Sequence, residues 1–142
     1  MALRRDELET LRAAVREAGL RATPSRISVL HLLRSAGSPV SHSEVVARLA
    51  SQAWDPATIY RNLTDLSDVG LARRTDVGDH IWRFEAITGS HQAQAHPHFV
   101  CTECGTVKCL PDLKYVTRAK APRAIRQKRV EVQVRGLCDA CI

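Results

Sequence analysis

The chain has 142 residues, enough for one larger domain or two small ones, each with a modest core. Its formal net charge of +6 favours polyanionic partners such as nucleic acid over neutral or cationic ones. No apolar run approaches the roughly 20 residues that a membrane-spanning helix needs, and the N-terminus lacks the apolar core of a signal peptide, so we expect a cytoplasmic protein with no membrane partner.

The first predicted elements are two amphipathic helices. Apolar residues recur at helical spacing from Asp6 onward, and Gly19 is expected to end this first helix. Thr23 can cap a second helix, with Pro24 in the first turn, where a missing N–H costs nothing. This spacing predicts two consecutive helices in the first part of the chain.

Two further helices and a hairpin complete the first domain. Ser41 opens a third helix as the first residue of a capping-box pattern, and a fourth helix follows Asp55. Two short alternating segments, 71–74 and 81–84, predict a β-hairpin. Helices followed by a hairpin are typical of a winged helix-turn-helix, so we predict a DNA-binding domain over residues 1–84.

The second half of the chain is predicted to form a small α/β domain. Residues 85–97 are rich in Gly, Ser, Gln, Ala and His and predict a hinge before a second domain at 98–142. Strands are expected at 98–101, at 107–110 and around 130–134. The predicted fold class is therefore α+β, a winged helix-turn-helix followed by a small α/β domain.

One segment of this second domain is strongly basic. Residues 113–129 carry seven basic side chains and no acidic one. The segment could be helical, although Pro122 favours a break or kink within it. Whether it forms one continuous helix is left open.

Four of the five cysteines form two CxxC pairs. Each pair can direct two sulfurs at one point, so together they can close a tetrahedral zinc shell. A thioredoxin-like redox pair would need a βαβ context, which the pattern lacks, and a disulfide framework is not expected in the cytosol. We therefore predict a structural zinc site made of Cys101, Cys104, Cys138 and Cys141.

The fourth helix carries side chains suited to a DNA groove. Its core face is expected to be Ile59, Leu63 and Leu66, which leaves other positions to contact bases, thymine methyl groups and phosphates. The alternative is an ordinary solvated helix face. Arg21 and Arg26 are candidate phosphate contacts, with plain surface charge as the alternative. The candidate groove contacts are Thr58, Tyr60, Arg61 and Asn62.

Four motifs follow one another along the chain: Arg-Ala-Thr-Pro-Ser-Arg at 21–26, Ala-Thr-Ile-Tyr-Arg-Asn-Leu at 57–63, the stretch 96–105 around the first CxxC pair, and 136–141 around the second. In this order they resemble the motifs of the ferric uptake regulator (Fur) family. The resemblance covers nearly the whole chain. It implies a dimeric, metal-responsive repressor of metal uptake or homeostasis genes that binds AT-rich inverted repeats through its winged helix. It also implies that the second domain is the dimerisation domain and that the four paired cysteines hold structural zinc.

The same resemblance implies a second, regulatory metal site. His96 and His98 hold the family's ligand positions before the first CxxC pair, Glu85 stands where relatives carry a hinge ligand, and Cys109 stands where relatives often place a carboxylate. Two imidazoles, one carboxylate and one thiolate suit zinc better than ferrous iron. Zinc is therefore the expected regulatory ion, with Fe²⁺ as the alternative. The alternative for Cys109 is a small buried apolar residue.

The chain also departs from the family pattern. The gap from Glu85 to His96 is longer than usual, so His91 could take the place of Glu85. Pro39 replaces a frequent histidine, and His42, three residues on, is another candidate ligand. The basic segment lacks the ligands that support a third metal site in some relatives, so none is expected there.

Two rival functions stay open. An iron- or peroxide-responsive regulator could use the same scaffold, and a zinc-ribbon protein-interaction module would not bind DNA at all. An enzyme with a small-molecule substrate is not expected, because no Ser/His/Asp set, phosphate loop or open zinc triad is visible. The operator, the target genes and the sign of regulation cannot be derived from the sequence.

Overall fold

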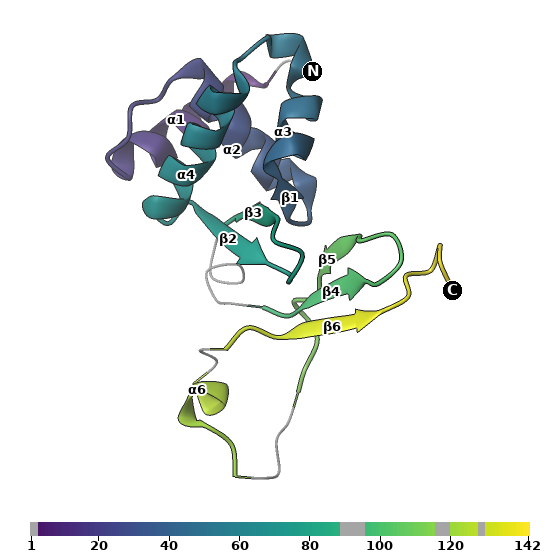
Figure 1. The fold of residues 1–142 in the computed structure, drawn as a ribbon. Coiled ribbons are helices and arrows are strands. Elements are labelled where there is room, and N and C mark those ends of the chain that lie inside the picture. The colour runs from purple at the N-terminus through teal and green to yellow at the C-terminus, as the bar shows by residue number, and fades with distance from the viewer. Residues whose placement is uncertain (1–2, 89–95, 116–119, 128–129) are drawn as a thin grey trace. The chain divides into compact units, whose positions relative to one another are not determined.

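The computed structural model describes residues 3–88, 96–115, 120–127 and 130–142 (Figure 1). The chain divides into two compact units, Met1–Ile87 and Thr88–Ile142. No helix in the described ranges is both long and apolar enough to cross a membrane.

Four helices build most of the first unit, and local capping explains where two of them begin. The side-chain oxygen of Thr23 accepts a hydrogen bond from the Arg26 N–H at 3.3 Å, and that of Ser41 accepts one from the Glu44 N–H at 3.2 Å. Both predicted caps are confirmed. Asp55 does precede the fourth helix, but its side chain makes no capping bond within the described structure. The helices are α1 (Arg5–Glu17), α2 (Pro24–Ala36), α3 (His42–Arg48) and α4 (Pro56–Asp68), with a 3₁₀ turn at Ala50–Gln52 after α3.

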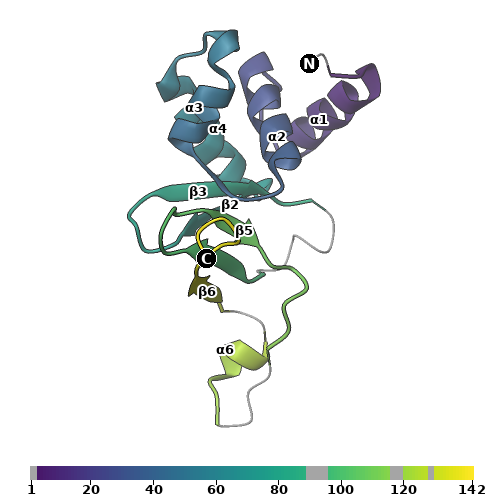
Figure 2. The ribbon, with the colours of Figure 1, turned by 90° about the vertical axis from the view of Figure 1, so that its right-hand side faces the viewer.

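A small antiparallel sheet completes this unit. Its strands are β1 (Val40–Ser41), β2 (Ala72–Asp76) and β3 (Trp82–Ala86), in the order β1-β3-β2. Figure 2 shows the helices together on one side of the β2–β3 hairpin. The predicted hairpin is confirmed, although both strands run two residues beyond their predicted ends.

The core of the first unit comes from the apolar faces of these elements. Its largest fully buried side chains include Leu30 from α2, Ile59 and Leu63 from α4, and Phe84 from β3. The helix α2 packs on both α1 and α4, and α3 packs on α4. The apolar face predicted for the fourth helix, Ile59, Leu63 and Leu66, is therefore confirmed. The helix α4 contacts both α2 and α3.

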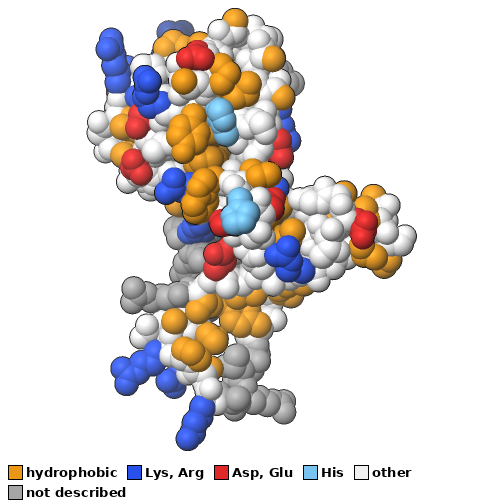
Figure 3. Space-filling model, in the orientation of Figure 1, with side chains coloured by type: hydrophobic (Ala, Val, Ile, Leu, Met, Phe, Trp, Pro, Cys, Tyr) orange, Lys and Arg blue, Asp and Glu red, His pale blue; other side chains and the backbone are white. Residues whose placement is uncertain are grey.

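The second unit is a three-stranded sheet with a long connection between its last two strands. Its strands are β4 (His98–Cys101), β5 (Val107–Cys109) and β6 (Gln133–Gly136), in the order β5-β4-β6. The pair β4–β5 is antiparallel and the pair β4–β6 is parallel. Between β5 and β6, the described residues form only the short helix α6 (Arg123–Arg126), which starts directly after Pro122. Figure 3 shows Lys and Arg side chains projecting from the surface around α6.

Candidate functional site

The two CxxC pairs meet at one end of the second sheet. Cys101 ends β4, and Cys138 follows two residues after the end of β6. Because β4 and β6 are parallel, with Cys101 opposite Gly136, the residues that follow the two strands leave the sheet at the same end. All four cysteines, including Cys104 and Cys141, bring their sulfur atoms within 4.8 Å of one another.

The sulfur geometry fits a zinc ion. The Cys104 and Cys138 sulfurs lie 3.7 Å apart, and all the cysteines are free thiols. That distance is much longer than the ~2.05 Å of a disulfide. Four thiolates at ~2.3 Å from a tetrahedral zinc ion lie about 3.8 Å from one another. The donor set therefore matches a structural zinc site.

Hydrogen bonds lower the pKa of two thiols in this cluster and so favour the thiolate form that binds a cation. The backbone N–H groups of Cys104 and then Cys138 donate to the Cys101 sulfur and lower its pKa to about 6. The Thr106 hydroxyl lies 3.0 Å from the Cys104 sulfur and lowers the pKa of that thiol. Hydrogen bonding with Cys138 and then with Cys104 raises the pKa of Cys141 to about 12. A divalent cation neutralises such crowded negative charge and takes its cysteine ligands as thiolates.

A second group of metal-ligand side chains lies within the same unit. His98 on β4 stands directly opposite Cys109 on β5, and the His96 ring lies 4.7 Å from the His98 ring, centroid to centroid. Each of the three residues offers a nitrogen or sulfur atom within 4.8 Å of the others. His98 is only 3% exposed. Strand pairing places Cys109 beside His98, and His96 lies two residues before His98, so three of the four residues predicted for the regulatory site lie together.

The remaining predicted ligands belong to the first unit or fall outside the described residues. Glu85 lies inside β3, beyond the predicted end of that strand, and its carboxylate is 4.0 Å from the Arg73 guanidinium. The His42 Nε2 atom lies 2.8 Å from the Pro56 carbonyl oxygen. No group of three or more potential ligands in the described ranges includes His42. His91 falls outside the described residues.

The surface of α4 agrees only partly with the prediction. Tyr60 and Arg61 are exposed and Thr58 is half-buried. Asn62, in contrast, is 4% exposed, and its amide donates to the Ser25 hydroxyl at 2.9 Å. The prediction that Asn62 lies on the outer face is wrong, because it follows Ile59 by three positions and so shares the buried face of the helix.

A charged pair joins α2 to this helix. The Arg26 guanidinium donates to the Asp65 carboxylate at 2.6 Å and to the Arg21 carbonyl at 2.7 Å, and the Arg26 side chain is 12% exposed. Arg26 is therefore not the open phosphate contact that was predicted, whereas Arg21 is exposed. On the other side, His42 packs edge-on against the Tyr60 ring at 5.4 Å. Both contacts join residues far apart in the chain, so no local sequence pattern predicts them.

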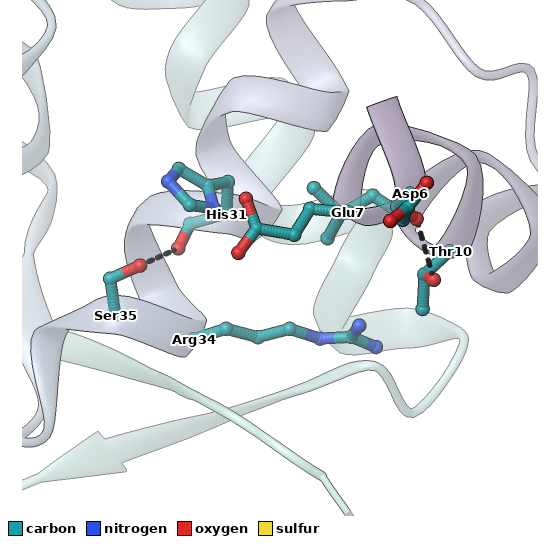
Figure 4. Close-up of a pocket in the computed structure, with 7 residues that line it drawn as sticks. Asp6, Glu7, Thr10, His31, Arg34 and Ser35 are labelled. Atoms are coloured by element: carbon teal, nitrogen blue, oxygen red, sulfur yellow. Dashed lines mark hydrogen bonds between the residues drawn. The ribbon is translucent and has the colours of Figure 1, made fainter. Parts of the chain in front are cut away.

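A pocket of about 340 Å³ lies between α1 and α2 (Figure 4). The Thr10 and Ser35 hydroxyls at its edge donate to carbonyls of their own helices, at 2.9 and 2.8 Å. Glu7 points toward His31, and the long Arg34 side chain runs beneath it. Charges of both signs therefore face each other here, and none of the predicted site residues lines the pocket.

Known proteins resemble the chain over both units. The model of the Ferric uptake regulator family matches residues 17–134. The peroxide-responsive repressor PerR of Staphylococcus aureus (strain Mu50 / ATCC 700699) is 31% identical over 147 aligned residues, covering 95% of this chain and 91% of that protein.

Two solved structures share the architecture. The Vibrio cholerae ferric uptake regulator (Fur) aligns with a TM-score of 0.66 at 24% identity, covering 89% of this chain and 98% of that chain, and shows the same fold. The crystal structure of holo XcZur aligns with a TM-score of 0.55 at 28% identity, covering 94% of this chain and 96% of that chain.

Proposed function

Because this chain belongs to the ferric uptake regulator family, we propose that it is a zinc-responsive repressor that binds double-stranded DNA as a homodimer. Members of this family are metal-responsive transcriptional regulators and not enzymes. The observation that carries the choice of zinc is the placing of the Cys109 thiol beside the imidazoles of His96 and His98. A thiolate with two imidazoles suits zinc better than ferrous iron, which prefers more oxygen ligands. The protein acts in the cytoplasm, where its DNA is.

In this proposal the two metal sites have different tasks. The four paired cysteines hold a permanent zinc ion that stabilises the second unit. His96, His98 and Cys109 hold the exchangeable ion, and Glu85, at the end of the first unit, supplies a fourth ligand, with His91 as the alternative. A ligand set that draws on both units fixes the angle between them. In a dimer that angle sets the spacing of the two α4 helices, which are the recognition helices of this proposal. A two-fold dimer of this kind matches an AT-rich inverted repeat.

The DNA contacts follow from the exposure of α4. Arg61, Tyr60 and Thr58 are available to the major groove, and Arg21 is available to a phosphate. Asn62 and Arg26 act indirectly, since their bonds to α2 fix the position of the recognition helix.

Metal-dependent DNA binding is the test of this function. Duplexes are selected from a random pool with the 142-residue protein prepared with one zinc ion per chain, and their affinity is measured at increasing free zinc. We expect zinc to raise the affinity about 5- to 150-fold, the usual range of such coupling. A larger response to Fe²⁺ than to Zn²⁺ would contradict the choice of zinc. Absence of duplex binding with every metal would contradict DNA regulation and favour the protein-interaction module.

The iron- or peroxide-responsive alternative rests on one finding. The relative at 31% identity is a peroxide-responsive repressor. Adding peroxide to the same titration distinguishes the two functions. A peroxide sensor should lose DNA affinity when its ferrous form is treated with peroxide, whereas a protein loaded with zinc should keep it.

Replacing two neighbouring residues of α4 should lower two different quantities, DNA affinity for Arg61 and stability for Asn62. Arg61→Ala should lower affinity for the selected duplex by about 1–3 kcal/mol and leave the free energy of unfolding within about 0.5 kcal/mol of the parent value, because its side chain is exposed. Asn62→Ala should lower the free energy of unfolding by about 1–3 kcal/mol, because Ser25 then loses its buried partner. Urea unfolding and fluorescence anisotropy measure the two quantities. Unchanged stability of Asn62→Ala together with lost DNA binding would restore Asn62 as a direct contact.

A further inference from the structure

The positive charge of this protein is not where a DNA-binding domain would be expected to carry it. The first unit, Met1–Ile87, has 12 basic and 11 acidic residues, a net charge of +1. The second unit, Thr88–Ile142, has 9 basic and 4 acidic residues, a net charge of +5. Seven of those nine basic residues lie in 113–129, which has no acidic residue, so the rest of the chain has 14 basic and 15 acidic residues. The whole net positive charge therefore comes from one segment of the second unit.

The described part of this segment presents its charges to solvent. Four of its basic side chains are exposed, and Arg123 and Arg126 lie three positions apart on α6, on the same side of that helix. No salt bridge among the described residues involves any of the four. Figure 3 shows Lys and Arg side chains around α6 with no acidic side chain beside them on the face that is drawn. These four residues, Lys114, Lys120, Arg123 and Arg126, form the basic patch.

We propose that the basic patch binds the phosphate backbone of DNA, so that the second unit supplies a sequence-independent share of the affinity. The proposal rests on the proposed function. Contacts to phosphates provide most of the non-specific binding of DNA-binding proteins, and each one releases condensed counterions. A first unit with a net charge of +1 is poorly equipped to provide this term alone, whereas the second unit carries five positive charges in excess.

Duplex DNA fits the patch better than an acidic protein partner does. DNA presents about one negative charge per 1.7 Å, and phosphate contacts need positive charge near the backbone without a fixed base geometry. When α4 of the first unit is bound to DNA, the second unit is tethered to that DNA. The effective concentration of phosphates around the second unit is then high. A partner protein would have to provide a separate acidic surface.

The salt dependence of binding tests this proposal. The variant Lys114→Gln, Lys120→Gln, Arg123→Gln, Arg126→Gln is compared with the parent on a selected duplex and on an unrelated duplex, at about 50 to 200 mM salt. For each phosphate that the variant no longer binds, the slope of log affinity against log salt should become shallower by about 0.9, and affinity at about 0.1 M salt should fall about eightfold. Both duplexes should lose the same factor, because phosphate contacts carry no sequence information.

Matched variants separate the patch from general effects of charge and folding. Arg123→Gln with Arg126→Gln removes two charges from the patch, and Lys108→Gln with Arg135→Gln removes two from exposed positions of β5 and β6 in the same unit. Only the first pair should change the slope, and Arg123→Lys with Arg126→Lys should restore it. Zinc content and urea unfolding confirm that each variant is folded.

Three outcomes would overturn the proposal. These are a parental slope in the fourfold variant, a lower affinity with an unchanged slope, and an equal change in the control pair. A parental slope together with lost binding to poly-glutamate would point to an acidic protein partner instead. If the parent itself binds no duplex at any zinc level, the proposed function fails first.

Discussion

Cys104→Ser should unfold the second unit and abolish both dimerisation and DNA binding. The buried apolar core of that unit is small, because its buried apolar side chains among the described residues are Pro97, Val100, Cys101 and Val107 alone. A structural zinc site contributes roughly 10–16 kcal/mol of apparent binding free energy, which is comparable to the whole stability of a typical domain of 5–15 kcal/mol. With one thiolate removed, the remaining three cysteines cannot close the tetrahedral shell.

Zinc content, hydrogen exchange and sedimentation together measure this effect. The variant should lose its tightly held zinc ion, exchange the amides of β4, β5 and β6 rapidly and sediment as a monomer, while α1 to α4 keep their protection. Cys109→Ser is the matched control, because it also removes one thiol from the second unit but leaves the four-cysteine group complete. A folded, dimeric Cys104→Ser protein that still holds one zinc ion would show that the cluster is not the scaffold of this unit.

The features that the sequence predicted well are those that depend on neighbours along the chain. Thr23 and Ser41 cap their helices through bonds that reach only three residues ahead, so the local pattern was sufficient. Each CxxC pair likewise lies in a local turn: the Cys141 N–H donates to the Cys138 carbonyl at 2.9 Å, and the Gly105 N–H donates to the Cys101 carbonyl at 3.1 Å. Such short-range geometry is determined by a few residues.

The missed features depend on contacts between distant segments. Arg26 meets Asp65, 39 positions later, and no local pattern distinguishes that arginine from one that is free to bind a phosphate. Asn62 was a different error, because its spacing from Ile59 already placed it on the buried face. The partnership of His98 and Cys109 depends on the register of two strands, which the family resemblance suggested and residue spacing alone did not.

Removing a ligand of the second group should remove the response to zinc without removing the scaffold. In His98→Ala, operator affinity should no longer rise with added zinc, so that the expected 5- to 150-fold gain falls to about onefold. Total zinc should fall from two ions to one per chain, because the four-cysteine group does not include His98. Linkage is reciprocal, so DNA should tighten zinc binding in the parent protein and should not do so in the variant.

A second variant keeps this test independent of folding. His98 is 3% exposed, so its removal leaves a cavity that can destabilise the sheet, whereas Cys109→Ser replaces one sulfur by an oxygen and conserves the shape of the side chain. Both variants should lose the zinc response, and His31→Ala, which removes a histidine from the first unit, should keep it. If Cys109→Ser responds to zinc as the parent does, Cys109 is a packed apolar side chain. The regulatory site then has no thiolate ligand that favours zinc over iron.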